Sequence, residues 1–163
     1  MPNQKIKIAI CISSYCRSRQ LGRLLDSFSL IKFERISEPD IKIVVIDNDQ
    51  NQSAEQICRE KKQNLKYPLH YHVEQKKGLS YARNLSVKMA GAVDYIVFVD
   101  DDEIVSENWL EEYLLMTKSH AAKAIFGRVD YQYISEMPDW LLNARIFDPV
   151  SYTHLRAHET HID

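Results

Sequence analysis

Glycine and cysteine are scarce in this chain, and its apolar runs are short. The 163 residues include four glycines and three cysteines, where average usage would give about eleven glycines. The sequence contains neither type of Gly-rich phosphate loop and no Gly-x-Ser-x-Gly nucleophile motif. The longest apolar runs, Ile8–Ile12 and Tyr95–Val99, are far below the ~20 residues that a membrane-crossing helix needs. We therefore expect no membrane span.

The cysteines and the N-terminus indicate an intracellular setting. Cys11, Cys16 and Cys58 are odd in number and lack a metal-ligand spacing, which predicts reduced, buried thiols. Lys5 and Lys7 interrupt the apolar stretch that a signal peptide would need. We expect a cytoplasmic protein, either free or at the inner face of the membrane.

The charge balance excludes a nucleic-acid partner. Lys plus Arg number 21 and Asp plus Glu number 23, for a net charge of -2, so the basic surface that binds phosphate backbones is absent. Hydrophobic residues make up 45% and charged residues 27%, ordinary values for a soluble globular protein. The length favours one domain.

Strand and helix patterns alternate along the chain. Buried strands are predicted at Lys5–Ile12, Ile41–Ile46, Leu69–Val73 and Tyr95–Val99. Helices are predicted over Leu21–Phe28, over 53–63 with Ser53-Ala-Glu-Gln56 as a capping box, over Leu79–Met89, and from Ser106 or Glu107. An extended stretch at Ala124–Tyr133 and a short helical turn within Met137–Ala144 follow. This alternation predicts an α/β fold with a mainly parallel sheet covered on both faces.

Polar side chains follow each predicted strand. They lie at Ser13–Arg17, at Asp47-Asn48-Asp49, at Lys76-Lys77-Gly78 with Arg83 beyond, and at Asp100–Glu103. Ligands of open α/β sheets bind beyond the carboxyl ends of the strands. We therefore expect Asp47, Arg83 and Asp102 to border one shared cleft.

The acidic run Asp100–Glu103 is the sharpest signal. Side chains alternate along an extended chain, so Asp100 and Asp102 should point to the same side. A divalent cation would relieve their repulsion, and hard oxygen ligands favour Mg²⁺ or Mn²⁺, which could bridge the oxygens of a diphosphate. The alternative is a solvated acidic turn that caps the helix starting near Glu107.

The other strand-end residues each allow two interpretations. Asp47 and Asp49 could accept hydrogen bonds from a nucleobase or shape the turn before the next helix. Lys77 and Arg83 could bind a diphosphate or be solvated helix-face charges. Gly78 suits a close backbone approach or a positive φ.

Four blocks of this sequence resemble the nucleotide-sugar half of the family-2 glycosyltransferases. They read IAICISSYCRSRQLGRLLDSF, IVVIDND, KKGLSYARNLSVKMA and YIVFVDDDEIVSENWL. The resemblance implies the GT-A (Rossmann-like) fold, with a mainly parallel sheet and helices on both faces. We expect this fold to be incomplete at the C-terminus. The domain would span residues 1–149.

The resemblance also implies a role for each matching residue. Asp47 would contact the base with Asp49 as a helper, Asp100 would lie near the ribose, and Asp102 would bind the metal with Asp100. The remaining donor-binding residues would be Ser14, Tyr15, Arg17, Lys77, Gly78, Arg83, Asn84 and Asp101. The implied donor is a nucleoside-diphosphate sugar, with UDP favoured, held with Mn²⁺ or Mg²⁺. The acceptor would be a hydroxyl of a glycan, lipid or protein, and the family inverts the anomeric carbon.

The sequence departs from the family in lacking an acidic general base beyond the Asp-x-Asp strand. The acidic residues between Gly127 and Pro149 are Asp130, Glu136, Asp139 and Asp148, and none sits in the expected setting. We expect this chain to be a fragment that binds the donor but is inactive in transfer.

Residues 150–163 do not continue the family pattern. They read like the translation of a transposase adapter used in sequencing libraries, and we treat them as a non-native tail. The competing interpretation is a zinc site, because His154 and His158 are spaced i, i+4 and His161 follows.

Two other functions remain as alternatives. A sugar-phosphate nucleotidyltransferase would need a glycine-rich loop after its first strand, and Ser13–Arg17 contains no glycine. A non-catalytic nucleotide-binding or receiver-type signalling module would need an isolated Asp after a central strand and a Lys on a later one.

Overall fold

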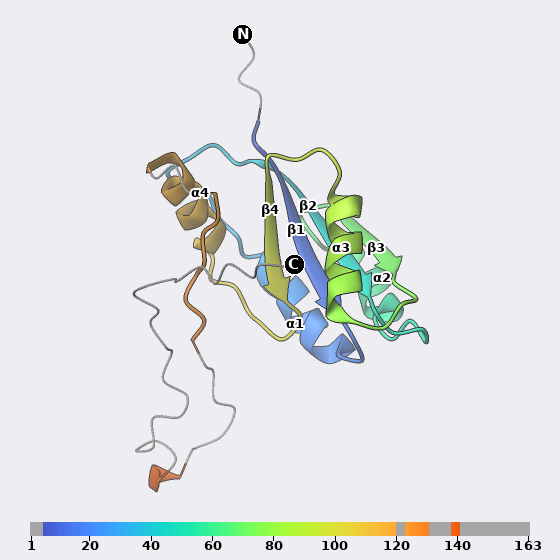
Figure 1. Cartoon of the computed structure of the whole chain (residues 1–163). Helices are drawn as coiled ribbons and strands as arrows, with labels where there is room; N and C mark the ends of the chain where they lie inside the picture. Colours follow the sequence, from blue (N-terminus) through green and yellow to red (C-terminus); the bar gives the residue numbers. More distant parts are fainter. Residues whose placement is uncertain (1–4, 120–122, 131–137, 141–163) are drawn as a thin grey trace, which may run out of the picture. The chain divides into compact units, whose positions relative to one another are not determined.

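The computed structural model describes residues 5–119, 123–130 and 138–140. The chain divides into two compact units, 1–121 and 122–163. In the first unit, strands and helices alternate along the chain (Figure 1). They are β1 (Lys7–Ser14), α1 (Ser18–Phe28), β2 (Asp40–Asp47), α2 (Glu55–Lys62), β3 (Leu69–Val73), α3 (Leu79–Ala90), β4 (Tyr95–Asp100) and α4 (Trp109–Ser119).

The four strands form one sheet in the order β3-β2-β1-β4. All three pairings are parallel, and Ile8 in the centre is level with Ile41 on one side and Tyr95 on the other. The chain adds strands outward from β1 to β3 and then crosses to the far side of β1 for β4. This reversal of direction beside β1 is where open α/β sheets leave a crevice for ligands. The predicted α/β fold with a parallel sheet is confirmed.

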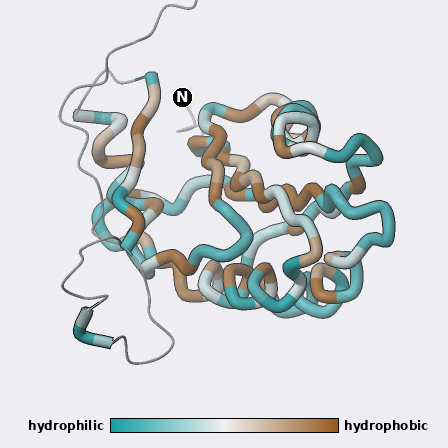
Figure 2. Tube along the Cα trace, turned by 60° about the horizontal axis from the view of Figure 1, so that its bottom comes forward, coloured by the Kyte–Doolittle hydropathy of each residue, from teal (hydrophilic) through white to brown (hydrophobic). Residues whose placement is uncertain are grey.

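The two faces of the sheet are covered differently. Ile8, Ile10 and Ile12 of β1 belong to a large core with the buried face of α1 and with Leu110 and Leu114 of α4. On the other face, the small side chains Ala9 and Cys11 pack against Ala82 and Ala90 of α3, so this helix can approach the strands closely. Figure 2 shows apolar residues concentrated along the strands and on the inner sides of the helices. Helices therefore cover both faces, as the alternation of patterns predicts.

Three predicted helix starts are wrong. α1 begins at Ser18 rather than at Leu21. α2 begins at Glu55, and its N-cap residue, Ala54, makes no side-chain cap. The Ser53 hydroxyl does not close a capping box, because it accepts a hydrogen bond from the Cys16 N–H at 3.2 Å. α4 begins at Trp109 rather than at Ser106 or Glu107.

The prediction of buried thiols holds for two of the three cysteines. All three are free, and Cys11 and Cys58 are buried. Burial raises the pKa of Cys58 to about 12, with the charge of Asp47 adding to the effect. The prediction is wrong for Cys16, which is exposed and adopts a left-handed conformation with φ of 54°. The hydrophobic pattern could not reveal this, since Cys16 lies in a loop.

The second unit is described only in part. Residues 124–130, the described part of the stretch predicted to be extended, form neither a helix nor a hydrogen-bonded strand. Asp139 and Trp140 are helical, as expected after Pro138. Residues 131–133, 141–144 and the 150–163 tail with its histidines lie outside the described residues, as do Glu136 and Asp148. Within the described ranges, no helix is both long and apolar enough to cross a bilayer.

A buried carboxylate joins α4 to the loop between α1 and β2. Glu111 Oε1 accepts hydrogen bonds from the backbone N–H groups of Glu34, Arg35 and Ile36 at 2.8, 2.6 and 3.1 Å. Its Oε2 accepts a hydrogen bond from Arg35 Nε at 3.2 Å. Burial would raise the pKa of Glu111, but these donors outweigh it and lower the pKa below its ordinary value.

We expect the Glu111→Gln substitution to lower the melting temperature by about 3–8 °C at pH 7. The neutral amide turns an N–H₂ group toward donors that need an acceptor. Since the folded-state pKa of Glu111 is lowered, the carboxylate's stabilisation is complete above the unfolded pKa of about 4.3 and is lost as the pH falls through the folded value. Thermal unfolding at pH 7 and pH 3 should show the difference between the two proteins shrinking in acid. A difference that is unchanged at pH 3 would contradict a role for the ionised group.

Candidate functional site

A cavity of about 400 Å³ opens at the carboxyl edge of the sheet, beside the beginning of α3. Eight predicted site residues line it, namely Ser14, Tyr15, Arg17, Lys77, Gly78, Asp100, Asp101 and Asp102. Ser13, Asn48, Leu79 and Ala82, which were not predicted, complete the lining. The loops after β1, β2, β3 and β4 thus meet where the reversal of strand order leaves a crevice.

The acidic turn after β4 is tied to the loop after β1. Asp101 is buried, and its Oδ2 accepts a hydrogen bond from the Ser14 hydroxyl at 2.8 Å. Arg17 Nη1 donates to Asp101 Oδ1 at 3.1 Å and to Asp102 Oδ2 at 2.7 Å. These bonds and charges raise the pKa of Arg17, with the hydrogen bond to Asp101 as the largest contribution. Asp101 therefore anchors the turn, while the Asp102 carboxylate is half exposed to the cavity.

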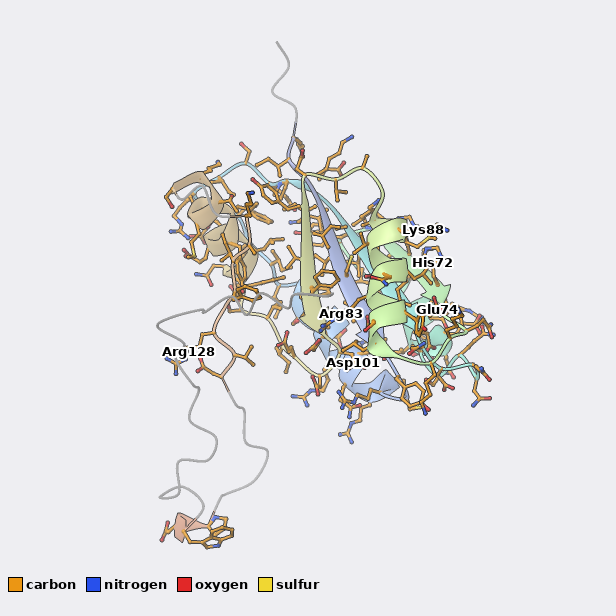
Figure 3. All side chains as sticks on the ribbon, viewed as in Figure 1. His72, Glu74, Arg83, Lys88, Asp101 and Arg128 are labelled. Atoms are coloured by element: carbon orange, nitrogen blue, oxygen red, sulfur yellow. The ribbon has the colours of Figure 1, made fainter. Side chains whose placement is uncertain are left out.

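Asp100, at the end of β4, faces the first turns of α3. Arg83 Nη2 donates to Asp100 Oδ1 at 3.3 Å, and its guanidinium lies over the Phe98 ring at 5.9 Å. Figure 3 shows Arg83 and Asp101 near this end of β4 and α3. Arg83 does not belong to the cavity lining but contacts the lining residue Asp100. Asn84 is on an exposed part of α3.

Asp47, the last residue of β2, and Asp49 lie outside the lining of the cavity that Asp102 borders. Asp47 is fully buried; its Oδ1 accepts the Asp49 N–H at 3.0 Å, and its Oδ2 accepts the Ala54 N–H at 2.7 Å and the Tyr71 hydroxyl at 2.9 Å. Asp49 accepts the Asn51 N–H at 3.0 Å, which is the main reason that its pKa is lowered. These contacts agree with the turn-shaping interpretation of both residues. Contact of Asp47 with a base stays a prediction.

The loop before α3 brings the positively charged side chain of Lys77 and the N-terminus of α3 to the cavity. Lys77 Nζ lies over the Tyr15 ring, 5.0 Å from its centre. Gly78 has a φ of 142°, which favours glycine over any residue with a side chain, and a Cβ there would lie 3.2 Å from the Tyr81 ring. Because Gly78 and Leu79 line the cavity, the positive end of the α3 dipole is presented to it.

Asn48 was not predicted as a site residue. It lines the cavity and is 8% exposed. Its backbone N–H donates to Ser14 O at 2.8 Å, and its side chain contacts the loop between β3 and α3. The sequence carries only a weak signal for it, an amide between two carboxylates, because its partners lie more than 25 residues further along the chain.

The cavity suits a cation that is shared with a substrate. Within the part of the chain that the structure describes, no group of three or more His, Cys, Asp or Glu side chains could hold a metal by itself. Mg²⁺ and similar ions commonly use one or two carboxylates and take their other ligands from water and substrate phosphates. The exposed carboxylates of Asp100 and Asp102, both on the lining, fit this kind of ion and not an all-protein cage.

The sequence matches a known family over nearly its whole length. Residues 9–162 match the model of the family described as "Glycosyl transferase family 2". The chain belongs to this family. This family-2 chain is 28% identical, over 141 residues, to the succinoglycan biosynthesis protein ExoM of Rhizobium meliloti (strain 1021), and the match covers 86% of the chain and 44% of ExoM.

Solved structures support the GT-A fold of the family-2 chain. S. aureus TarS 1-349 in complex with UDP-GlcNAc matches with a TM-score of 0.60 and 22% identity, over 78% of this chain and 37% of TarS. The mannosyltransferase PcManGT of Pyrobaculum calidifontis, in complex with GDP-Man and Mn²⁺, matches with a TM-score of 0.58 and 16% identity, over 69% of this chain and 32% of that one. The chain spans less than half the length of each of these three proteins.

Proposed function

We propose that this chain carries the donor site of a glycosyltransferase that binds a nucleoside-diphosphate sugar, with UDP favoured, and passes the sugar to an acceptor hydroxyl. The observation that supports it most is the cavity itself. It combines exposed Asp100 and Asp102 with Arg17 and Lys77 at the carboxyl edge of a GT-A sheet. Carboxylates alone would repel a diphosphate, and cations alone would not hold a metal, so the mixture suits a metal–diphosphate group.

Each lining residue would have a role in binding the donor. Asp102, with Asp100, would hold Mn²⁺ or Mg²⁺, which when bound neutralises the charge on the departing diphosphate. Lys77 and the start of α3 would bind phosphate oxygens. Tyr15, at the rim and 45% exposed, would border the base with Asp47 behind it. Arg83 and Asn84 would flank the donor from α3.

We infer that the transfer inverts the anomeric carbon and needs an acidic base that removes the acceptor proton. The acceptor would be a glycan, lipid or protein hydroxyl, and ExoM by its name belongs to a polysaccharide pathway. The described acidic residues of the second unit are exposed, and Asp130 is paired with Arg128 at 2.6 Å. Because the sequence offers no acidic residue in the setting of the family's general base, we propose that this chain binds the donor with negligible turnover.

Calorimetric titration of the chain with UDP tests the proposed function. We expect measurable binding with Mn²⁺ present, much weaker binding in EDTA, and weaker binding of ADP and GDP than of UDP. Mixing with UDP-GlcNAc should release UDP no faster than the uncatalysed control. Equal binding of UDP in Mn²⁺ and in EDTA would contradict the metal dependence. The absence of UDP binding in both would contradict the donor site.

Arg17 donates a hydrogen bond to Asp102 Oδ2, on the carboxylate that we propose as a metal ligand. We expect the Arg17→Met substitution to raise the affinity for Mn²⁺, in the absence of nucleotide, by about three- to tenfold, because a cation no longer has to displace the guanidinium from Asp102. Electron paramagnetic resonance of free Mn²⁺ measures this directly. The matched control is Arg59→Met, since Arg59 pairs with Glu55 on the surface. Unchanged or lower Mn²⁺ affinity of the Arg17 variant would refute the competition.

A further inference from the structure

The Asn48 side chain is fully engaged with one loop. Its Nδ2 donates to Glu74 O at 3.0 Å and to Lys76 O at 2.7 Å. Its Oδ1 accepts the Gly78 N–H at 2.7 Å. Two donors and one acceptor are what a primary amide offers in this geometry, so Asn48 holds the loop at three points.

Two of these hydrogen bonds lie on either side of Lys77, the lysine that lines the cavity. Lys76 O and Gly78 N lie immediately before and after Lys77, so the backbone of Lys77 is fixed from both sides. The loop is further closed by Glu74, whose N–H donates to Asp47 O at 2.9 Å and whose Oε1 accepts the Lys76 N–H at 2.8 Å. The Lys77 ammonium then lies over Tyr15 across the cavity.

We propose that Asn48 is a positioning residue that holds Lys77 and the beginning of α3 in place for the donor's diphosphate. The inference rests on the proposed function, and it adds a residue whose side chain acts on the donor only through this loop. A carboxylate at this position would direct an oxygen at the carbonyls of Glu74 and Lys76, so aspartate cannot replace the amide. Alanine would remove all three bonds without adding charge.

The proposal separates binding of the diphosphate from binding of the nucleoside. Asn48→Ala should weaken UDP binding by roughly tenfold, since hydrogen bonds of this kind contribute a modest net energy each. It should leave uridine binding within about twofold of the original, because uridine has no diphosphate for Lys77 to contact. Calorimetry measures UDP, and ligand-observed NMR measures the weaker uridine.

A double-mutant cycle tests whether Asn48 acts through Lys77. Lys77→Met should show the same selective loss of UDP affinity, and Asn48→Ala should change UDP affinity by less than about twofold in the Lys77→Met background. The matched control is Lys76→Met, because the Lys76 ammonium lies over the Tyr81 ring and not over Tyr15. Additive losses, or equal losses for UDP and uridine, would overturn the proposal.

Hydrogen exchange tests the loop without any nucleotide. Asn48→Ala should speed amide exchange in a peptide covering residues 74–80, where the Gly78 N–H loses its acceptor, and leave α1 unchanged. Asn48→Asp should also speed exchange there while keeping the size of the side chain. Unchanged exchange in both variants would refute the positioning role. If exchange is faster in the variants but the original chain binds no UDP, the role of Asn48 in holding the loop is supported. The proposed donor-binding function is then refuted.

Discussion

Replacing Asp102 by asparagine is expected to weaken Mn²⁺-dependent binding of UDP by at least about tenfold and up to about 100-fold. The amide loses the negative charge that holds the cation, and the exposed position of Asp102 on the cavity lining means that little else in the fold depends on it. Calorimetric titration with UDP at saturating Mn²⁺ for the original chain measures the effect.

The same variant should behave differently without metal. In EDTA, the Asp102→Asn chain should bind UDP as well as the original does or better, since Arg17 loses a carboxylate partner at 2.7 Å and becomes available to phosphate. Glu107→Gln is the matched control, because Glu107 is an exposed acid paired with Lys32 and lies outside the cavity lining. Tight, metal-independent binding by Asp102→Asn in both buffers would remove Asp102 from the metal site.

Replacing Asp47 by alanine is expected to lower the free energy of unfolding by about 2–4 kcal/mol. The change leaves two backbone N–H groups, of Asp49 and Ala54, and the Tyr71 hydroxyl without the carboxylate that accepts their hydrogen bonds. Burial and this carboxylate together raise the pKa of Tyr71, which shows how closely the two groups interact. Urea unfolding followed by circular dichroism measures the loss.

The control for Asp47 is a surface carboxylate. Asp26→Ala removes an exposed partner of Lys61 and should cost less than about 1 kcal/mol. UDP binding by the folded Asp47→Ala chain then tests the predicted base contact: a loss for uridine as well as for UDP supports it. An unfolding free energy within 0.5 kcal/mol of the original (about the error of such comparisons) would show that the buried contacts of Asp47 are unimportant.

The strands and their ends could be predicted because their signals are local. Ile41–Ile46, with β-branched residues at nearly every position, lies within the observed Asp40–Asp47, and polar residues directly after each strand must reach the same edge of a parallel sheet. That reasoning is enough to bring Ser14, Lys77 and Asp102 to one cavity.

The contacts between loops could not be predicted in the same way. Ser53 has the right neighbours for a capping box, yet its hydroxyl accepts the N–H of Cys16, 37 residues earlier. Asp101 looks equivalent to Asp100 and Asp102 in the sequence, yet it alone is buried, because Ser14 and Arg17 approach it from the loop after β1. Which polar residues bind one another across strand ends depends on the three-dimensional arrangement, which the periodicity of a single segment does not encode.

The central place of β1 governs the order in which this protein can be assembled. β1 is synthesised before the other three strands of this sheet, but its partner β4 ends at Asp100 and pairs with it across nearly 90 residues of chain, from Ile8 to Tyr95. All the strand pairs are parallel, and parallel neighbours cannot form as a hairpin, so the sheet begins from contacts that are distant in the sequence and slow to form. During synthesis, one edge of β1 therefore stays open until Tyr95–Asp100 has emerged from the exit tunnel.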